Sequence, residues 1–290
     1  MRVQTWLQPP ATGGSETASD SAEGTENVTA VVIDVLRATT VATTALAAGA
    51  RSIATCRNVD EAFAMRDASG SDSPPLLCGE RGCRRIDGFD FGNSPSEYSP
   101  AGVGGRDLIL TTTNGTAAID AAADAQTMIL ASFANLSAVV DDLIVRHGAD
   151  RDAGGTENAS GLIRLVCSGT NGDVTTEDVL LAGALLAACH RRLSDSPRFY
   201  DGPVELTNDC GAIALAVWQH SLTHEGVTDS ATLAERLSQT QGGRNLIAAG
   251  YESDLVDCGA IDVFDNVPIR TQCQPACFIN ASDLPASTGG

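Results

Sequence analysis

The chain has 290 residues, of which 37 are Asp or Glu and 18 are Arg; it contains no lysine, and its formal net charge at pH 7 is -19. Without lysine there is no Walker-type phosphate loop, which needs a lysine after its glycines, and no Schiff-base or pyridoxal phosphate chemistry. Such an acidic surface disfavours nucleic-acid and membrane partners at ordinary salt, and it suits a salty cell interior, because the Debye length falls to about 3 Å near 1 M salt. We therefore expect a halophilic source.

The length allows one large domain or two small ones, and 43% hydrophobic residues predict a folded core. We predict a single domain, residues 1–290. Residues 2–7 alternate in the manner of a short strand. Two polar stretches without periodicity, 11–27 and 150–161, are predicted to be flexible insertions, and residues 286–290 a loose tail.

Three segments share one design: an apolar run, a turn rich in hydroxyls and glycine, and then a helix. The runs are 30–35, 108–110 and 162–166, and the turns that follow them are 36–40, 111–116 and 167–173. The first helix is expected to end near Ala48, before Gly49, and the third to span about 176–192. Residues 175–178 give the third helix a capping hydroxyl and an acidic first turn.

This alternation predicts an α/β protein, a layered α/β/α fold with a mainly parallel or mixed sheet. The second and third turns share Thr-Asn-Gly in register, which hints at two similar halves. Because turns after parallel strands gather at one edge of a sheet, the three turns are expected to form an anion site from N–H groups, hydroxyls and helix N-termini. Phosphate is the obvious ligand.

Asp34 ends the first apolar run, and Arg37 follows three residues later. Neither charge is comfortable near a core unless it is paired or bound to a ligand, so the pair indicates a functional site; the alternative is a buried salt bridge that fixes the loop. A haloacid-dehalogenase phosphatase needs a second acid two residues after the first, where this chain has Leu36. That fold is disfavoured.

Residues 79–85 concentrate three arginines between glycines. Guanidinium groups match phosphate and sulfonate oxygens in pairs, and an acidic protein must focus positive potential somewhere to hold an anion. The alternative is a solvated basic loop that pairs with surface acids. Asn93, in the following Gly-Asn-Ser-Pro turn, is either a ligand group or a turn former.

Acidic side chains among apolar neighbours recur near the C-terminus, at residues 254–265, and at Glu177 and Asp178. Hard divalent cations prefer carboxylates, and magnesium usually takes one or two of them together with substrate oxygens. Plain acidic surface decoration is the alternative for each of these residues.

Nine cysteines are scattered through the chain, and no run of 18 apolar residues or signal-peptide pattern occurs. We therefore expect a cytoplasmic protein with reduced thiols. Five residues after Cys167 comes Asp173, so the Cys-x5-Arg loop of thiol phosphatases is absent, which argues against a thiol nucleophile.

Several of these segments together resemble the 2-phosphosulfolactate phosphatase family, a group of magnesium-dependent phosphatases linked to coenzyme M biosynthesis. The resembling runs are Asp-Val-Leu-Arg-Ala-Thr-Thr at 34–40, Gly-Glu-Arg-Gly at 79–82, Gly-Phe-Asp-Phe-Gly-Asn-Ser-Pro at 88–95, Thr-Thr-Thr-Asn-Gly-Thr at 111–116, Cys-Ser-Gly at 167–169 with Glu177 and Asp178, Ala-Gly-Ala at 182–184, and Asp-Val-Phe-Asp at 262–265. They cover nearly the whole chain in family order. One departure is Gln241-Gly242, where the family usually shows a histidine-glycine pair.

The resemblance implies hydrolysis of 2-phosphosulfolactate to sulfolactate and phosphate with Mg2+ as cofactor. On this basis we assign the metal to Asp34 and one or more of Glu177, Asp178 and Asp262. We assign Asp34, Arg37, Glu80 and Arg81 to the catalytic group, with both arginines holding phosphate or sulfonate. The expected substrate-binding residues are Thr39, Thr40, Asn93, Thr112, Thr113, Asn114, Gly115, Ser168 and Gly169. An acidic α/β enzyme of this size often pairs, so a homodimer is also expected.

Two alternatives stay open. In the first, the chain is a phosphatase of the same family that acts on another phosphorylated hydroxy acid. In the second, it is a non-catalytic anion-binding protein. The sequence does not decide whether Asp34, Cys167 or a metal-activated water attacks phosphorus.

Overall fold

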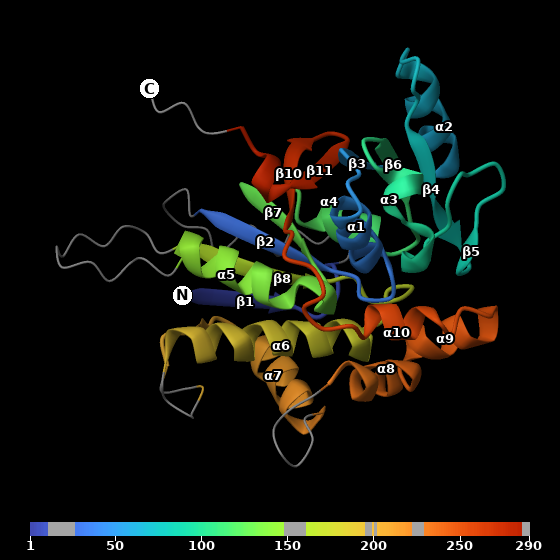
Figure 1. Cartoon of the computed structure of the whole chain (residues 1–290). Coiled ribbons are helices and arrows are strands. Elements are labelled where there is room, and N and C mark those ends of the chain that lie inside the picture. Colours follow the sequence, from blue (N-terminus) through green and yellow to red (C-terminus); the bar gives the residue numbers. More distant parts are fainter. Residues whose placement is uncertain (11–26, 148–160, 195–198, 200–201, 222–228, 286–290) are drawn as a thin grey trace, which may run out of the picture.

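The computed structural model describes residues 1–10, 27–147, 161–194, 199, 202–221 and 229–285. Nearly all of the two predicted insertions and the whole predicted tail lie outside these residues. The described part is an α/β structure with one large mixed sheet (Figure 1), as the alternation of apolar runs and helices predicts. None of the described helices combines the length and the hydropathy that a bilayer crossing requires.

The strands are β1 Arg2–Trp6, β2 Val28–Ile33, β3 Ser52–Thr55, β4 Leu76–Arg81, β5 Arg84–Arg85, β6 Asp107–Thr111, β7 Thr127–Ala131, β8 Leu162–Cys167, β9 Glu205–Leu206, β10 Pro268–Cys273 and β11 Ala276–Asn280. The helices are α1 Ala38–Ala47, α2 Val59–Ala68, α3 Pro100–Val103, α4 Gly115–Ala121, α5 Leu136–His147, α6 Thr176–Leu193, α7 Asp209–Ser221, α8 Ser230–Ser238, α9 Gln241–Ala249 and α10 Asp254–Cys258. All three predicted strand–turn–helix units are confirmed, as β2–α1, β6–α4 and β8–α6. Thr175 is the N-cap residue of α6, but its hydroxyl makes no cap hydrogen bond, so that predicted detail is wrong.

The sheet consists of two parallel blocks joined by an antiparallel hairpin, and the short strand β5 pairs antiparallel with β4 at one edge. Its strand order is β5-β4-β6-β3-β11-β10-β7-β2-β8-β1-β9. Strands β7, β2, β8, β1 and β9 are mutually parallel, as are β4, β6 and β3, and the hairpin β10–β11 pairs antiparallel with β7 on one side and β3 on the other. From β7 through β10 and β11 to β3 there are three successive antiparallel pairings, so the strands of the two blocks run in opposite directions. In a flat sheet their carboxyl ends would lie at opposite edges.

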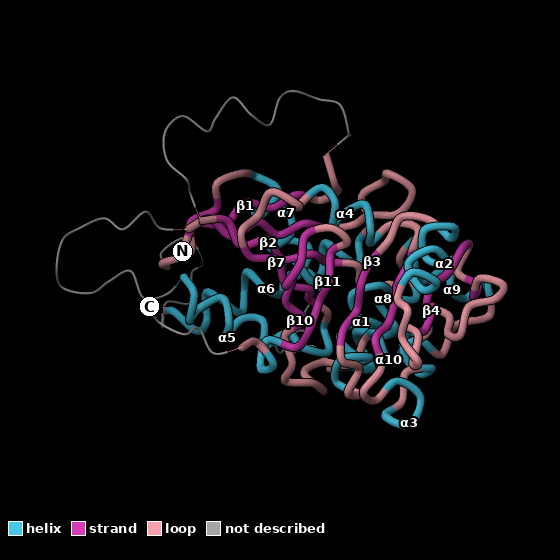
Figure 2. The backbone as a smooth tube through the Cα atoms, turned by 90° about the horizontal axis from the view of Figure 1, so that it is seen from above, coloured by secondary structure: helices cyan, strands magenta, loops and turns pink. Residues whose placement is uncertain are grey.

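Curvature brings these ends together. The sheet bends around α1 and α4, and the strands of the two blocks are inclined to one another (Figures 1 and 2). One continuous core cluster holds Val32 from the first block, Leu108 from the second, and Val41 of α1 between them. Eight of the ten α1 residues are buried, as expected for a helix enclosed on several sides, and its small alanine and threonine side chains allow that close packing.

The first block is covered on both faces. Alternate residues of β2 point to opposite faces, so Val31 and Ile33 join the cluster under α5, α6 and α7, whereas Ala30 and Val32 join the α1 side. The second block carries α2 on its outer face, where Leu77 and Ile109 pack with Ala62. The layered α/β/α prediction is therefore confirmed. The predicted similarity of two halves stays a prediction.

Candidate active site

The turns after β2, β6 and β8, the β4–β5 hairpin and helix α9 surround one cavity of about 470 Å³. The cavity is lined by Asp34, Leu36, Arg37, Glu80, Gly82, Cys83, Arg84, Asn93, Thr112, Thr113, Asn114, Thr170, Asn171, Gly242, Asn245, Leu246, Ala248 and Ala249. Seven of the residues proposed from the sequence are in this set: Asp34, Arg37, Glu80, Asn93, Thr112, Thr113 and Asn114. The convergence that the sequence predicts is therefore present, although the strands arrive from two blocks.

Asp34 lies where β2 ends and α1 begins, and it is 5% exposed. One carboxylate oxygen accepts a hydrogen bond from Ala38 N at 3.0 Å. The Thr39 hydroxyl accepts from Asp34 N and donates to Asp34 O, which fixes the backbone at the acid. Burial, opposed by the Ala38 hydrogen bond and reinforced by the negative charge of Glu80, raises the pKa of Asp34 to about 6.

Asp178, in the first turn of α6, bridges two of the turns. One of its oxygens accepts from Val35 N at 2.9 Å, and the other accepts from the Ser168 hydroxyl at 2.9 Å and from Gly169 N at 3.0 Å. Burial raises the pKa of Asp178 well above its ordinary value, and the nearby charges of Asp34 and Glu177 add to this effect. Asp178, Ser168 and Gly169 therefore support the cavity from behind and do not line it.

Glu80 likewise joins two loops by accepting hydrogen bonds from both, here in the second block. One oxygen accepts from both the N–H and the hydroxyl of Thr113, at 2.9 and 2.8 Å, and the other accepts from Cys83 N at 2.8 Å. With both oxygens engaged, Glu80 is a positioning residue that ties the β4–β5 hairpin to the turn after β6.

Arg37 is held by a third buried acid. Its guanidinium pairs with Asp254 of α10, donates to Cys83 O at 2.9 Å and lies over the Tyr251 ring at 4.7 Å. The second oxygen of Asp254 accepts from the Ser94 hydroxyl at 2.5 Å. Arg37 and Asp254 are 2% and 1% exposed, so this is a buried ion pair in which both oxygens of Asp254 accept hydrogen bonds.

The two Thr-Asn-Gly turns meet directly, because Asn171 N donates to Asn114 Oδ1 at 3.0 Å. Gly115 packs so closely here that a β-carbon on it would lie 2.9 Å from Asp34 Oδ2 and 2.7 Å from Ala38 Cβ. Any larger residue would push against the carboxylate. Glycine at 115 is therefore a steric requirement of the site.

Three buried oxygen atoms at or near the cavity have no hydrogen-bond partner among the described residues: Asn93 Oδ1 and Thr112 Oγ1, from residues that line it, and Glu177 Oε2, from a residue that does not. Glu177 lies directly under α9, since a β-carbon on Gly242 would come within 2.2 Å of Glu177 Oε1. Burial raises the pKa of Glu177. Unsatisfied buried oxygens are costly, and their grouping here indicates a place for a ligand.

The carboxylates of Asp34 and Glu177 fit a magnesium site of the usual kind, in which one or two carboxylates bind the ion and substrate and water oxygens take the remaining positions. Asp34 and Glu177 are close enough for the charge of Glu177 to raise the pKa of Asp34. Within the described ranges, no three acidic, histidine or cysteine side chains form a metal cluster by themselves. The residues therefore suit a metal shared with substrate better than a closed protein cage.

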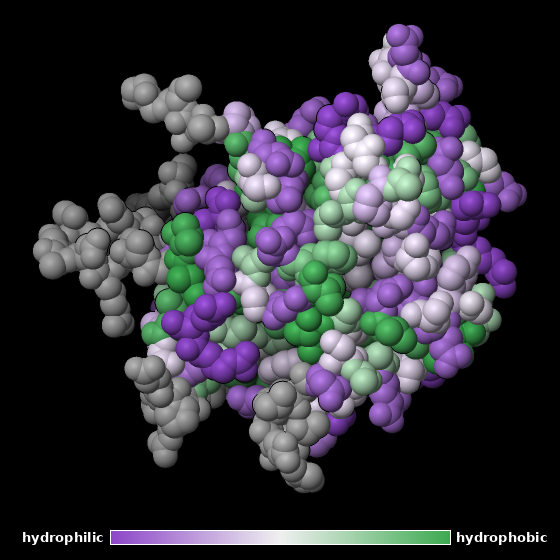
Figure 3. Space-filling view, viewed as in Figure 1, coloured by the Kyte–Doolittle hydropathy of each residue, from purple (hydrophilic) through white to green (hydrophobic). Residues whose placement is uncertain are grey.

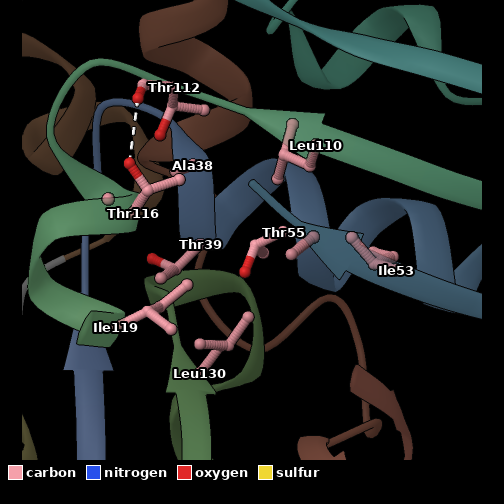
Figure 4. Close-up of a pocket in the computed structure, with 11 residues that line it drawn as sticks. Ala38, Thr39, Ile53, Thr55, Leu110, Thr112, Thr116, Ile119 and Leu130 are labelled. Carbon is pink, nitrogen blue, oxygen red and sulfur yellow. Dashed lines mark hydrogen bonds between the residues drawn. The ribbon is translucent and has the colours of Figure 1, made fainter. Parts of the chain in front are cut away.

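Several residues proposed from the sequence lie outside the cavity. The Thr40 hydroxyl donates to Val35 O, and the Arg81 guanidinium is engaged by Glu80 O, Arg57 O and Thr111 Oγ1. Thr39 and Gly115 border a separate cavity of about 10 Å³, large enough for about one water, behind Thr112 (Figure 4). None of these four residues lines the larger cavity: Thr39 and Thr40 are buried and hold their loop, and Arg81 is exposed but is engaged by its three partners.

Asp262 is not brought to the other acids. Its carboxylate accepts from the N–H and the hydroxyl of Ser137, both at 2.7 Å, at the start of α5. An acid at a helix N-terminus satisfies free N–H groups and suits the helix dipole, which accounts for its position. The sequence-based assignment of Asp262 to a metal is not supported by this geometry.

Reasoning from the sequence missed Arg84, Asn171, Asn245 and Asp254. Arg84 lay in the arginine-rich stretch and Asp254 in the acidic stretch, but neither pattern ranks one member above its neighbours. Asn245 and Gly242 lie in the segment where the chain departs from the expected histidine-glycine pair.

Comparison with known proteins agrees with this geometry. A sequence model described as 2-phosphosulpholactate phosphatase matches residues 16–272. The chain belongs to the 2-phosphosulfolactate phosphatase family. A protein of Thermotoga petrophila named probable 2-phosphosulfolactate phosphatase is 36% identical over 240 residues, 83% of this chain and 88% of the relative. Relatives with the same name from Symbiobacterium thermophilum and Prochlorococcus marinus are 37% identical (84% of this chain, 92% of the relative) and 32% identical (90% and 96%).

The raised pKa of Asp34 predicts how the folding stability of this family member depends on pH. Its folded pKa of about 6 lies above the ordinary 3.8, so between these values the folded state keeps a proton that the unfolded chain has lost. Stability therefore falls as pH rises from 3.8 to about 6 and stays lowered above it, by up to about 3 kcal/mol. In the presence of chelator, Asp34→Asn should raise the melting temperature at about pH 7.5, and this gain should shrink steadily as pH falls towards about 4. A gain that is absent, or that does not change with pH, would contradict the assignment.

The buried pair of Arg37 and Asp254 makes a second prediction. Asp254→Ala leaves the Arg37 charge buried without its partner and should lower the unfolding free energy by about 3 kcal/mol or more, measured by urea unfolding. Asp257→Ala is the matched control, because Asp257 is on the same helix and makes no ion pair with Arg37. Equal stability of the two variants would show that the pair is not needed.

Proposed function

We propose that the chain is a Mg2+-dependent phosphatase that hydrolyses 2-phosphosulfolactate to sulfolactate and inorganic phosphate. The observation that supports this most directly is that Asp34 and Arg37, from the turn after β2, meet Thr112, from the turn after β6, at one cavity in a chain of this family. In the overall reaction, the ester P–O bond breaks, water supplies the oxygen that replaces it on phosphorus, and the departing oxygen takes a proton to give the hydroxyl of sulfolactate. The link to coenzyme M biosynthesis follows from the substrate and is part of the proposal.

Asp34 and Glu177 would hold the metal, and Asp178 would fix the two loops that carry them. When bound, Mg2+ neutralises phosphate oxygens and polarises the phosphorus for attack. The family assignment of Glu177 to the metal agrees with its unpartnered oxygen, and that of Asp178 is replaced by a supporting role.

The remaining polar groups would orient the phosphate. Arg37 enters the cavity already aligned by Asp254 and Tyr251, so little side-chain freedom remains to be lost when it binds an anion. The buried Thr112 hydroxyl has no partner among the described residues, and a phosphate oxygen bound against it would supply one. Glu80 engages both donors of Thr113, and Asn114 Oδ1 accepts from Asn171 N, so the turn presents the side-chain NH2 group of Asn114 at a fixed position.

The thiol of Cys167 is unsuited to attack phosphorus. It is fully buried at the end of β8, and burial raises its pKa well above the ordinary value, so it stays protonated at neutral pH. The attacking group is then either water or the Asp34 carboxylate.

The cellular setting completes the proposal. We infer a cytoplasmic enzyme from a salty interior, active as a homodimer. Hydrophilic residues dominate the face shown in Figure 3, with apolar residues grouped in a band across its middle. Several exposed arginines are already paired with acids, including Arg51, Arg57, Arg146 and Arg192, so they do little to offset the surplus of negative charge.

The metal assignment is tested by phosphate release from 2-phosphosulfolactate at high salt. Chelator should abolish the release and Mg2+ should restore it, because the phosphate charge needs a cation. Glu177→Gln should raise the Mg2+ concentration for half-maximal rate by at least about 10-fold, since it removes one charged oxygen ligand.

Asp262→Asn is the matched control, because Asp262 caps α5 and should leave the magnesium requirement unchanged. Activity that survives chelation would remove the metal from the proposal. Equal release from many unrelated phosphate esters would favour another substrate in the same family, and phosphate binding without hydrolysis would favour the non-catalytic alternative.

The net charge of -19 makes a separate prediction about salt. Raising KCl from about 0.1 M to about 2 M should raise the melting temperature markedly, because screening reduces repulsion among the surface carboxylates. Sucrose is the control for a general effect of solutes on hydrophobic burial. A melting temperature that stays constant, or that rises no more in KCl than in sucrose, would exclude the halophilic assignment.

A further inference from the structure

Two arginines, Arg37 and Arg84, line the cavity. The charge of Arg37 is matched by Asp254 in a buried ion pair. Arg84 is exposed, and its guanidinium makes no hydrogen bond or ion pair with the residues that the structure describes. It therefore supplies the positive charge at this cavity that is not already balanced by an acid.

The backbone that carries Arg84 is fixed by the site itself. Arg84 opens β5 and pairs with Arg81 on β4. The preceding residue, Cys83, donates its N–H to Glu80 at 2.8 Å, and its carbonyl accepts from Arg37 at 2.9 Å. Glu80 and Arg37 thus hold the backbone just before Arg84, while the long side chain of Arg84 remains in solvent at the cavity wall.

The surroundings of Arg84 suit an anion. The cavity also presents the amide side chains of Asn114, Asn171 and Asn245, and the acid on the same hairpin, Glu80, has both oxygens engaged. A volume of about 470 Å³ is in the range that holds a whole small-molecule ligand, well beyond the needs of one phosphate group.

We propose that Arg84 binds the second anionic group of the substrate, the sulfonate or carboxylate that stays on the product when the phosphate is removed. This inference rests on the proposed phosphatase function. A guanidinium binds either group through two parallel hydrogen bonds. Because the contact is the same before and after the P–O bond breaks, it stabilises ground state and transition state alike, and its loss raises KM while leaving kcat nearly unchanged.

The test compares kcat and KM of the wild type and Arg84→Gln on three esters: 2-phosphosulfolactate, 2-phospholactate and isopropyl phosphate. With 2-phosphosulfolactate, the substitution should raise KM about 10- to 100-fold, the range for losing charge-assisted hydrogen bonds, and change kcat less than about threefold. With isopropyl phosphate, which carries no second anion, KM should stay near the wild-type value. An effect that persists on 2-phospholactate identifies the carboxylate as the group bound; an effect confined to 2-phosphosulfolactate identifies the sulfonate.

Arg85→Gln is the matched control, since Arg85 is the next residue of β5, lies outside the cavity lining and donates to Asp90 O. It should behave as the wild type does. The proposal is overturned if Arg84→Gln leaves KM unchanged, raises it equally for all three esters, or acts no differently from Arg85→Gln. If the wild type hydrolyses none of the esters, the proposed phosphatase function fails independently of Arg84. The role of Arg84 is then tested by calorimetric binding of sulfolactate, and equal affinity of wild type and variant would refute it.

Discussion

Buried carboxylates that each bind two separate loops determine the shape of this site. Asp178 accepts N–H groups from the turns after β2 and β8, and Glu80 joins the β4–β5 hairpin to the turn after β6. Asp254 joins Arg37 to Ser94. A buried negative charge is costly unless hydrogen bonds satisfy it, so each acid stabilises only the arrangement in which its loops are together. The cavity is the space these bridges leave.

This arrangement divides the acids into two kinds. Where both oxygens are engaged, as in Glu80, Asp178 and Asp254, the carboxylate holds the framework. Asp34 and Glu177 instead retain capacity for a ligand. Burial raises the pKa of both, and the charge of Glu177 adds to this effect at Asp34. A divalent cation bound by both would neutralise their charges, so the same burial that disfavours the bare carboxylates would favour metal binding.

The local fold was predictable because it depends on local pattern. The apolar run of β2 and the turn and alanine-rich helix after it are determined by near neighbours, and the structure agrees. The opposite directions of the two strand blocks depend on the β10–β11 hairpin, at the far end of the chain, and no local pattern reports them. Likewise Asp178 and Asp262 look equivalent in sequence, since each is an acid among apolar residues. Only tertiary placement directs the first to two loops of the site and the second to the start of α5.

The overall charge makes the two cavity arginines more significant. An anion approaching a chain of net charge -19 meets a repulsive field, which salt screens at long range but much less inside a cavity with low-dielectric walls. Attraction must therefore come from cations at the cavity itself. Arg37 is balanced by Asp254, which orients it for hydrogen bonding but removes much of its net charge, whereas Arg84 keeps its full charge at the cavity wall. Orientation of the phosphate and attraction of the anion are thus assigned to different arginines, held on either side of the same Cys83 peptide unit.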